Sequence, residues 1–265
     1  MKRFAWVFAM SVLIAPLAGA QSSGVAGPAA PGEPPVTVLF DNGPLVNSPG
    51  TGPGGADESL ARDVTVGLTS RGFNHSLTGG YRVADDFTIT GPSWNVAAIR
   101  FYPYMGGSPT TPSPITAVNL QIWNGSPDLP TSAVVFGDTT TNRLVVSTFA
   151  TIYRRLESQP TDATRPVMSA TASVGTTLPP GTYWLDWQVD GDVAYTGPWA
   201  PPVTIDGQTT TGNALQFVTS AWQPAVDATL LTALGLPFVI EGVLASLFAD
   251  GFESGGTTLW SATLP

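Results

Sequence analysis

Carboxylates and aromatic side chains are the residues of this chain that could do chemistry, because the other reactive types are scarce. The 265 residues include no Cys, a single His and a single Lys, Lys2. The lack of Cys excludes a thiolate nucleophile and a Cys-ligated metal, and one His cannot form the His-rich sites typical of catalytic zinc. The lack of Lys beyond residue 2 excludes a Schiff-base enzyme and a phosphate-loop Lys.

An aromatic ring, a carboxylate and an amide share one face of the strand-like segment 182–189. Side chains alternate between the two faces of a strand, so Trp184, Asp186 and Gln188 lie together. The segment 117–123 ends on Trp123, which shares a face with two amides. Flat rings beside hydrogen-bonding side chains suit a sugar, so we take these four named residues as candidate carbohydrate-binding residues. Packing of this face against a second sheet is the alternative.

Carboxylates near turns offer a candidate calcium site. Asp190 and Asp192 flank one Gly, and Asp85 lies on an earlier strand. Calcium takes six to eight oxygen ligands, for which carboxylates are suited. The sequence contains no complete D-x-D-x-D-G calcium loop, and Asp also favours turns through its own backbone hydrogen bonds. A structural calcium on these three residues and ordinary turn aspartates both remain open.

A pair of carboxylates could also hydrolyse a glycosidic or peptide bond. A glycosidase needs two carboxyl groups roughly 5–10 Å apart in a cleft. Asp186 with Glu241, or Asp186 with Asp85, are conceivable pairs, and an acid protease would use similar groups. No local motif marks either pair, so we name no catalytic residue and expect the protein not to be an enzyme. A secreted glycosidase or acid protease stays the alternative.

Two further charged or titratable spots are expected to be ordinary surface features. His75 lies in the polar segment 72–80 without a G-x-S-x-G motif, so we expect an exposed loop side chain rather than a general base. Arg154 and Arg155 form a compact basic spot beside acidic residues. We expect them to make surface ion pairs, which contribute little to stability.

The elements that would position these residues are short strands. Apolar segments alternate with Gly, Pro and Asp turns, which predicts an all-β fold. Several segments alternate apolar and polar residues, as an antiparallel sheet with one buried face requires. We expect an antiparallel β-sandwich of jelly-roll-like character in a single domain, 36–243, with a helix of two turns only at Val226–Leu234. The predicted strands are 36–40, 82–90, 95–104, 117–123, 132–136, 143–152, 166–174, 182–189, 214–220 and 237–242.

The two ends of the chain indicate export. Lys2 and Arg3, an apolar stretch and Ala18-Gly19-Ala20 form the three parts of a secretory signal peptide, predicted at 1–20. A Pro/Gly/Ala-rich linker is expected at 21–35 and a C-terminal tail at 244–265. No later run is long and apolar enough to span a membrane. We therefore expect a secreted or cell-surface location.

The charge of the processed chain restricts its partners. Removal of residues 1–20 leaves eight arginines against 19 carboxylates, a net charge of −11. A basic footprint for nucleic acid is absent. We expect a monomeric, non-catalytic extracellular module whose ligand is a polysaccharide or another surface protein.

Three short motifs resemble those of exported bacterial proteins. The tail D-G-F-E-S-G at 250–255, followed by Trp260, resembles a C-terminal element of many secreted bacterial proteins. The A-D-D-F segment at 84–87 and the segment 121–125 are similar to elements of secreted or surface-anchored bacterial β-sandwich proteins, most of them uncharacterised. The resemblance implies a β-sandwich fold and an exported location, and it implies no function.

Overall fold

The computed structural model describes residues 35–60 and 65–245. The expected signal peptide at 1–20, the expected linker as far as residue 34, and the expected tail beyond residue 245 lie outside the described residues. Within the described part, no helix is long and apolar enough to cross a membrane.

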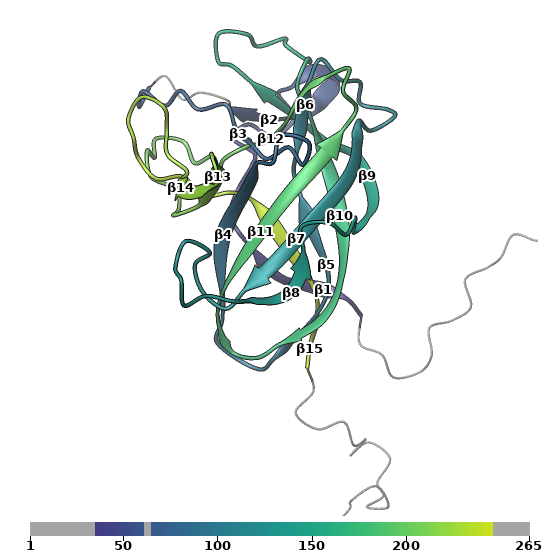
Figure 1. Cartoon of the computed structure of the whole chain (residues 1–265). Coiled ribbons are helices and arrows are strands. Elements are labelled where there is room, and N and C mark those ends of the chain that lie inside the picture. The colour runs from purple at the N-terminus through teal and green to yellow at the C-terminus, as the bar shows by residue number, and fades with distance from the viewer. Residues whose placement is uncertain (1–34, 61–64, 246–265) are drawn as a thin grey trace, which may run out of the picture. The chain divides into compact units, whose positions relative to one another are not determined.

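Two sheets pack face to face and confirm the expected β-sandwich (Figure 1). The first sheet runs in the order β1-β15-β5-β10-β6-β12-β3, and β9 joins it by pairing with β10 and β2. Its strands are β1 (Thr37–Asp41), β2 (Asp57–Leu60), β3 (Phe73–Asn74), β5 (Trp94–Phe101), β6 (Tyr104–Gly106), β9 (Leu144–Arg155), β10 (Pro166–Leu178), β12 (Thr196–Ala200) and β15 (Phe238–Leu244).

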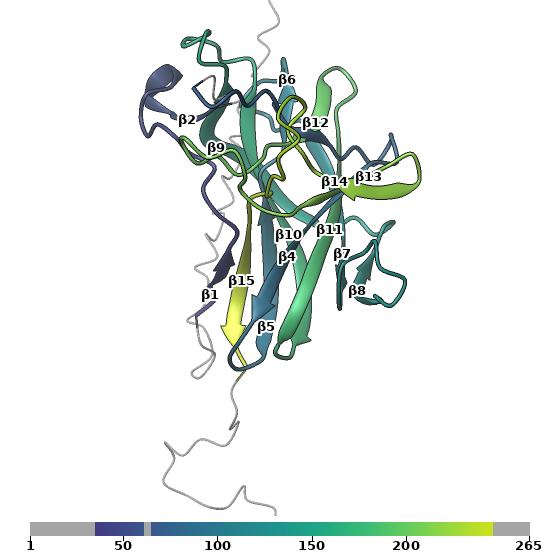
Figure 2. The ribbon, with the colours of Figure 1, turned by 90° about the vertical axis from the view of Figure 1, so that its left-hand side faces the viewer.

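The second sheet runs in the order β14-β13-β4-β11-β7-β8 and is the nearer layer in Figure 1. Figure 2 shows the two layers from the side, with β1 and β15 in one and β7 and β8 in the other. The strands of this sheet are β4 (Arg82–Ile89), β7 (Ile115–Trp123), β8 (Val134–Asp138), β11 (Gly181–Gly191), β13 (Leu215–Val218) and β14 (Ala221–Pro224).

The connections give the sandwich its jelly-roll-like character. Consecutive strands β4 and β5 lie in different sheets, and so do β10 and β11. Strand β4 pairs with β11 while β5 pairs with β10, so this ribbon wraps from one sheet to the other. Among the strands that the structure describes, the pairings are antiparallel apart from β2 with β9, which run parallel.

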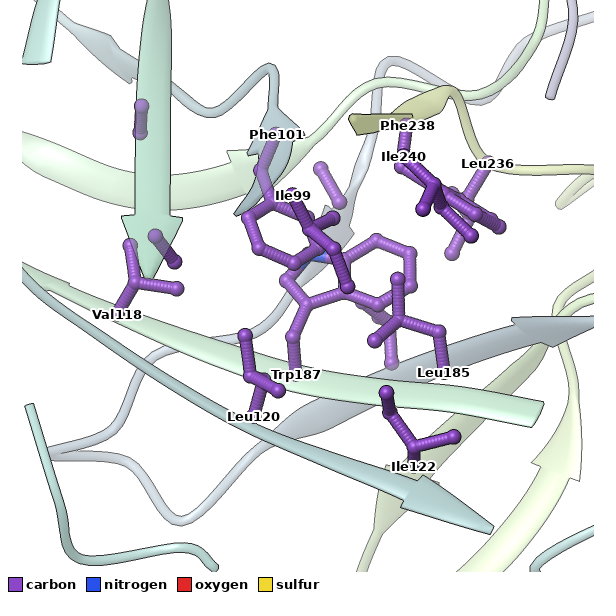
Figure 3. Packing of buried hydrophobic residues seen from close by; sticks show 14 of the residues in the cluster. Ile99, Phe101, Val118, Leu120, Ile122, Leu185, Trp187, Leu236, Phe238 and Ile240 are labelled. Carbon is purple, nitrogen blue, oxygen red and sulfur yellow. The ribbon is translucent and has the colours of Figure 1, made fainter. Parts of the chain in front are cut away.

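The core fills the space between the sheets with the inward-facing residues of each strand. Trp187 on β11 stacks on Phe101 of β5 at 5.1 Å between ring centroids and meets Phe238 of β15 at 5.9 Å (Figure 3). Leu185 on the same strand is fully buried beside them. Because side chains alternate along a strand, this arrangement leaves Trp184, Asp186 and Gln188 on the outer side of β11.

The prediction of a helix at Val226–Leu234 is wrong, because this segment forms a tight turn. Asp227 is fully buried, and its carboxylate accepts backbone N–H groups of Thr229 and Leu230 inside the turn. It also accepts the N–H groups of Thr69 and Ser70 from a distant segment, at 2.7 and 2.8 Å. These hydrogen bonds fix the chain in a turn in place of a helical ladder.

Candidate functional site

The four predicted sugar-binding residues come together on the outer side of the second sheet. Trp184, Asp186 and Gln188 follow one another along β11, and Trp123 on β7 lies directly opposite Trp184 in the sheet register. The alternation expected from the sequence therefore describes their arrangement correctly. Their exposure is much lower than a flat binding platform would require.

Three of these residues are buried, and one is partly exposed. Trp184 is 8% exposed, Asp186 1% and Gln188 6%. The Gln188 amide donates to the carbonyl of Thr139 at 2.7 Å and is thereby occupied by the loop after β8. Trp123 is partly exposed, so it is the member of the predicted set that a ligand can reach most readily.

Asp186 lies at the centre of a network that the sequence did not reveal. Its Oδ2 accepts Nη1 of Arg82 at 3.0 Å and the indole N–H of Trp123 at 3.2 Å. Arg82 also donates to the side-chain oxygen of Gln121 at 3.0 Å. Burial raises the pKa of Asp186 to about 7, although Arg82 and Trp123 oppose the rise by favouring the charged form.

The hairpin β13–β14 completes this network with two aromatic rings. The Arg82 guanidinium lies 4.5 Å from the ring centroid of Phe217 and 5.0 Å from that of Trp222. A guanidinium over aromatic rings is attracted by their negative faces. Trp222 and Trp123 are both partly exposed, and both pack against the cluster that contains Trp184.

We call Trp123, Trp184, Trp222, Arg82 and Gln121 the tryptophan face. Three indoles of the second sheet gather here on the side away from the core. Sequence reasoning did not place Trp222 or Arg82 on this face, since the hairpin β13–β14 that carries Trp222 joins β4, the strand of Arg82, through a pairing distant in sequence. Hydrogen bonds and ring contacts hold the polar members in fixed orientations. The face can therefore offer ring surfaces together with fixed hydrogen-bonding groups.

The three aspartates proposed for calcium do not form one site. Asp85 points into the sandwich, where its Oδ2 accepts the amide of Asn42 at 2.8 Å and the N–H of Leu236 at 2.7 Å. Asp190 lies at the end of β11, where it accepts the Thr78 hydroxyl and the Gly191 N–H, and Asp192 follows the strand and accepts the Ala194 N–H. Among the described residues, no three His, Cys, Asp or Glu side chains gather closely enough to hold a metal ion.

The two conceivable hydrolase pairs are not brought together either. Asp186 and Asp85 lie on neighbouring strands, but Asp186 faces outward and Asp85 faces the core. Glu241 belongs to β15 of the other sheet and forms an ion pair with Arg100. Neither pair therefore faces a common cleft, which glycosidase chemistry requires.

The expectation of an exposed His75 is wrong. The side chain is fully buried. Its segment is folded over the end of the sandwich because β3 pairs with β12 and the His75 carbonyl accepts the Val189 N–H at 2.9 Å. Burial lowers the pKa of His75 to about 3, so the ring is neutral at physiological pH.

The expectation of surface ion pairs at Arg154 and Arg155 is also wrong. Their side chains are 1% and 0% exposed, because the parallel strand β2 covers the end of β9. Arg155 forms an ion pair with Glu58 at 2.7 Å. Arg154 donates instead to neutral oxygens, including the Ser59 hydroxyl at 2.9 Å and the Arg71 carbonyl at 3.0 Å.

Searches of protein-family models, of curated protein sequences and of solved structures found no match to this chain.

Proposed function

We propose that this chain is a non-catalytic extracellular or cell-surface module that binds a saccharide on the tryptophan face. The observation that carries the proposal is the gathering of three indoles on the outer side of a sheet, one of them, Trp222, in contact with the fixed guanidinium of Arg82. Sugar rings present C–H faces that pack on aromatic surfaces, and their hydroxyls bond to polar side chains such as Gln121 and Arg82.

The face is held in shape before any ligand arrives. The Trp123 indole N–H is anchored to Asp186, and Arg82 is held by that same carboxylate and by Phe217 and Trp222. Groups that are already ordered lose little conformational freedom on binding. Trp123 and Trp222 are therefore the expected contacts, while Trp184 and Asp186 support them from beneath.

Retention on insoluble polysaccharides tests this proposal. The protein is mixed with a panel of neutral polysaccharides, and the bound fraction is measured for the unchanged chain, Trp123→Ala and Trp222→Ala. We expect one polymer to retain the protein and each substitution to weaken retention at least tenfold. Parallel samples with calcium and with a chelator test whether the calcium considered above contributes.

Tyr153→Ala serves as the matched control, because Tyr153 is a partly exposed aromatic residue on β9 of the other sheet. It should leave retention unchanged. Circular dichroism of each variant shows whether it is folded. Retention by none of the polymers, or equal retention by folded Trp123→Ala and Trp222→Ala, would contradict the proposal.

A further inference from the structure

A hollow lies on the first sheet, away from the tryptophan face. Its volume is about 450 Å³, which is within the range of small-molecule sites. Strands β6 and β12 and the segments around residues 71 and 164 form its walls. We call it the arginine hollow, and the side chains that matter for its chemistry are Arg71, Tyr104, Thr164, Arg165, Thr196 and Trp199.

Positive charge is concentrated around this hollow in a chain with excess acid. Arg71 is exposed, and no carboxylate among the described residues pairs with it. Arg165 pairs with Asp162 at 2.5 Å, and the buried Arg154 below has neutral hydrogen-bond partners. The guanidiniums of Arg71, Arg154 and Arg165 thus bring three positive charges to this region, and Asp162 is the one carboxylate among the described residues that pairs with any of them. The resulting excess of positive charge favours an anion in the hollow.

The same buried guanidinium holds the walls of the hollow in place. Nε of Arg154 and the Tyr104 hydroxyl both donate to the Arg71 carbonyl, at 3.0 and 3.1 Å. Nε of Arg165 donates to the carbonyl of Arg154 at 3.0 Å. Burial raises the pKa of Tyr104, and the charges of Arg154, Arg165 and Arg71 oppose that rise, as expected for guanidiniums near one phenol.

Trp199 adds a flat apolar surface beside these charges. Its indole is partly exposed on β12 and packs against the cluster that contains Tyr104. Gly197 allows this placement, because it has a φ of +128° and a Cβ there would lie 2.7 Å from Cδ1 of Trp199. The hollow therefore combines guanidinium donors with a ring surface, a pairing that suits a ligand bearing both a carboxylate and a saturated ring.

We propose that the arginine hollow binds an acidic saccharide, with a uronate carboxylate on Arg71 and Arg165 and the sugar ring against Trp199. The planar guanidinium fork matches a carboxylate and gives short, charge-assisted hydrogen bonds. Thr164 and Thr196 also line the hollow, and their hydroxyl oxygens, whose hydrogens are donated to Asp162 and to the Gly106 carbonyl, can accept from sugar hydroxyls. This site is separate from the tryptophan face and does not depend on it.

Calorimetric titration of the full chain tests the proposal. The probes are trisaccharides of galacturonate, mannuronate and glucuronate, each compared with its methyl ester, which keeps the ring and removes the charge. We expect at least one trisaccharide to bind and its ester to bind at least tenfold more weakly. Arg71→Gln should weaken acid binding at least tenfold without unfolding the protein, because the Arg71 side chain is exposed.

Arg143→Gln is the matched control, since Arg143 packs over Phe136 at the other sheet and should leave binding unchanged. Any one of three results would overturn the proposal. These are no binding of any of the three trisaccharides, equal affinity for an acid and its methyl ester, and unchanged affinity for the acid in Arg71→Gln. Inorganic sulfate binding as tightly as the trisaccharide would overturn the saccharide assignment. Trp123→Ala should bind the uronate normally, which separates failure of this site from failure of the tryptophan face.

Discussion

Asp85, Asp186 and His75 are titratable side chains buried inside or against the sandwich, and each prefers its neutral form. Burial raises the pKa of both aspartates to about 7 and lowers that of His75 to about 3. The folded chain therefore keeps two protons that an unfolded chain releases above pH 4. It also lacks one proton that an unfolded chain takes up below pH 6.5.

These shifts predict that acid stabilises the protein moderately. Between about pH 4.5 and 6.5, Asp85 and Asp186 make the free energy of unfolding fall as pH rises, while His75 makes it rise. The net effect is one proton, or about 1.4 kcal/mol lost per pH unit. Urea unfolding across this range measures the slope. In Asp186→Asn the slope should nearly vanish, and an unchanged slope would show that Asp186 is ionised when folded.

Arg82 compensates the negative charge of Asp186. Replacing Arg82 should therefore lower the free energy of unfolding most at a pH where the Asp186 carboxylate is ionised. We expect Arg82→Leu to lower the free energy of unfolding by about 3 kcal/mol at pH 8, because it leaves a buried charge unpaired. The loss should be smaller at pH 5, where Asp186 is protonated. Arg100→Leu, which breaks a more exposed pair with Glu241, should cost less than about 1 kcal/mol at both pH values. Equal losses for the two variants would contradict this account.

At the scale of elements, single side chains attach the irregular parts of the chain to the sheets. Arg82 connects the hairpin β13–β14 to β11 through Phe217, Trp222 and Asp186. Asp227 ties the turn before β15 to a segment near residue 70. Burial alone would raise the pKa of Asp227, but the N–H groups of Leu230, Thr69, Thr229 and Ser70 outweigh it and lower the pKa to about 2.

We therefore expect Asp227→Asn to lower the free energy of unfolding by about 2 kcal/mol at pH 7, because charge-assisted hydrogen bonds become neutral ones. The lowered pKa means that this stabilisation is present above about pH 4 and is lost as pH falls toward 2. Urea unfolding at pH 7 and pH 3 measures both effects. Asp206→Asn, an exposed turn aspartate, is the control and should change stability little. A loss in Asp227→Asn that is no smaller at pH 3 would argue against the hydrogen-bond explanation.

Sequence periodicity predicted the long strands and some short ones, such as β1, β8 and β13, but it missed β2, β3, β12 and β14. Segments such as 117–123 and 182–189 alternate over enough residues to show a period of two, and they lie within β7 and β11. Strand β3 has two residues and β12 contains a proline, so neither shows that pattern. The same limit applies to the site. Alternation placed Trp184 beside Asp186, but their burial comes from contacts distant in sequence.

At the scale of the whole molecule, one face of the second sheet forms the core and the other carries the proposed binding site. Its inner face, with Trp187 and Leu185, packs on the first sheet, and its outer face carries the indoles of the proposed site. We expect Trp187→Ala to lower the free energy of unfolding by about 3–5 kcal/mol through lost packing. Chemical denaturation followed by fluorescence and circular dichroism measures this loss. A cost below 1 kcal/mol would contradict the assigned core.

The most direct test of the tryptophan face follows the indole N–H signals by nuclear magnetic resonance during titration with a soluble oligosaccharide of the retaining polymer. The account predicts that the signals of Trp123 and Trp222 shift with saturation, whereas those of the core residues Trp94 and Trp187 stay in place. Assignment comes from single Trp→Phe variants. Shifts absent from Trp123 and Trp222, or confined to other indoles, would contradict saccharide binding on this face.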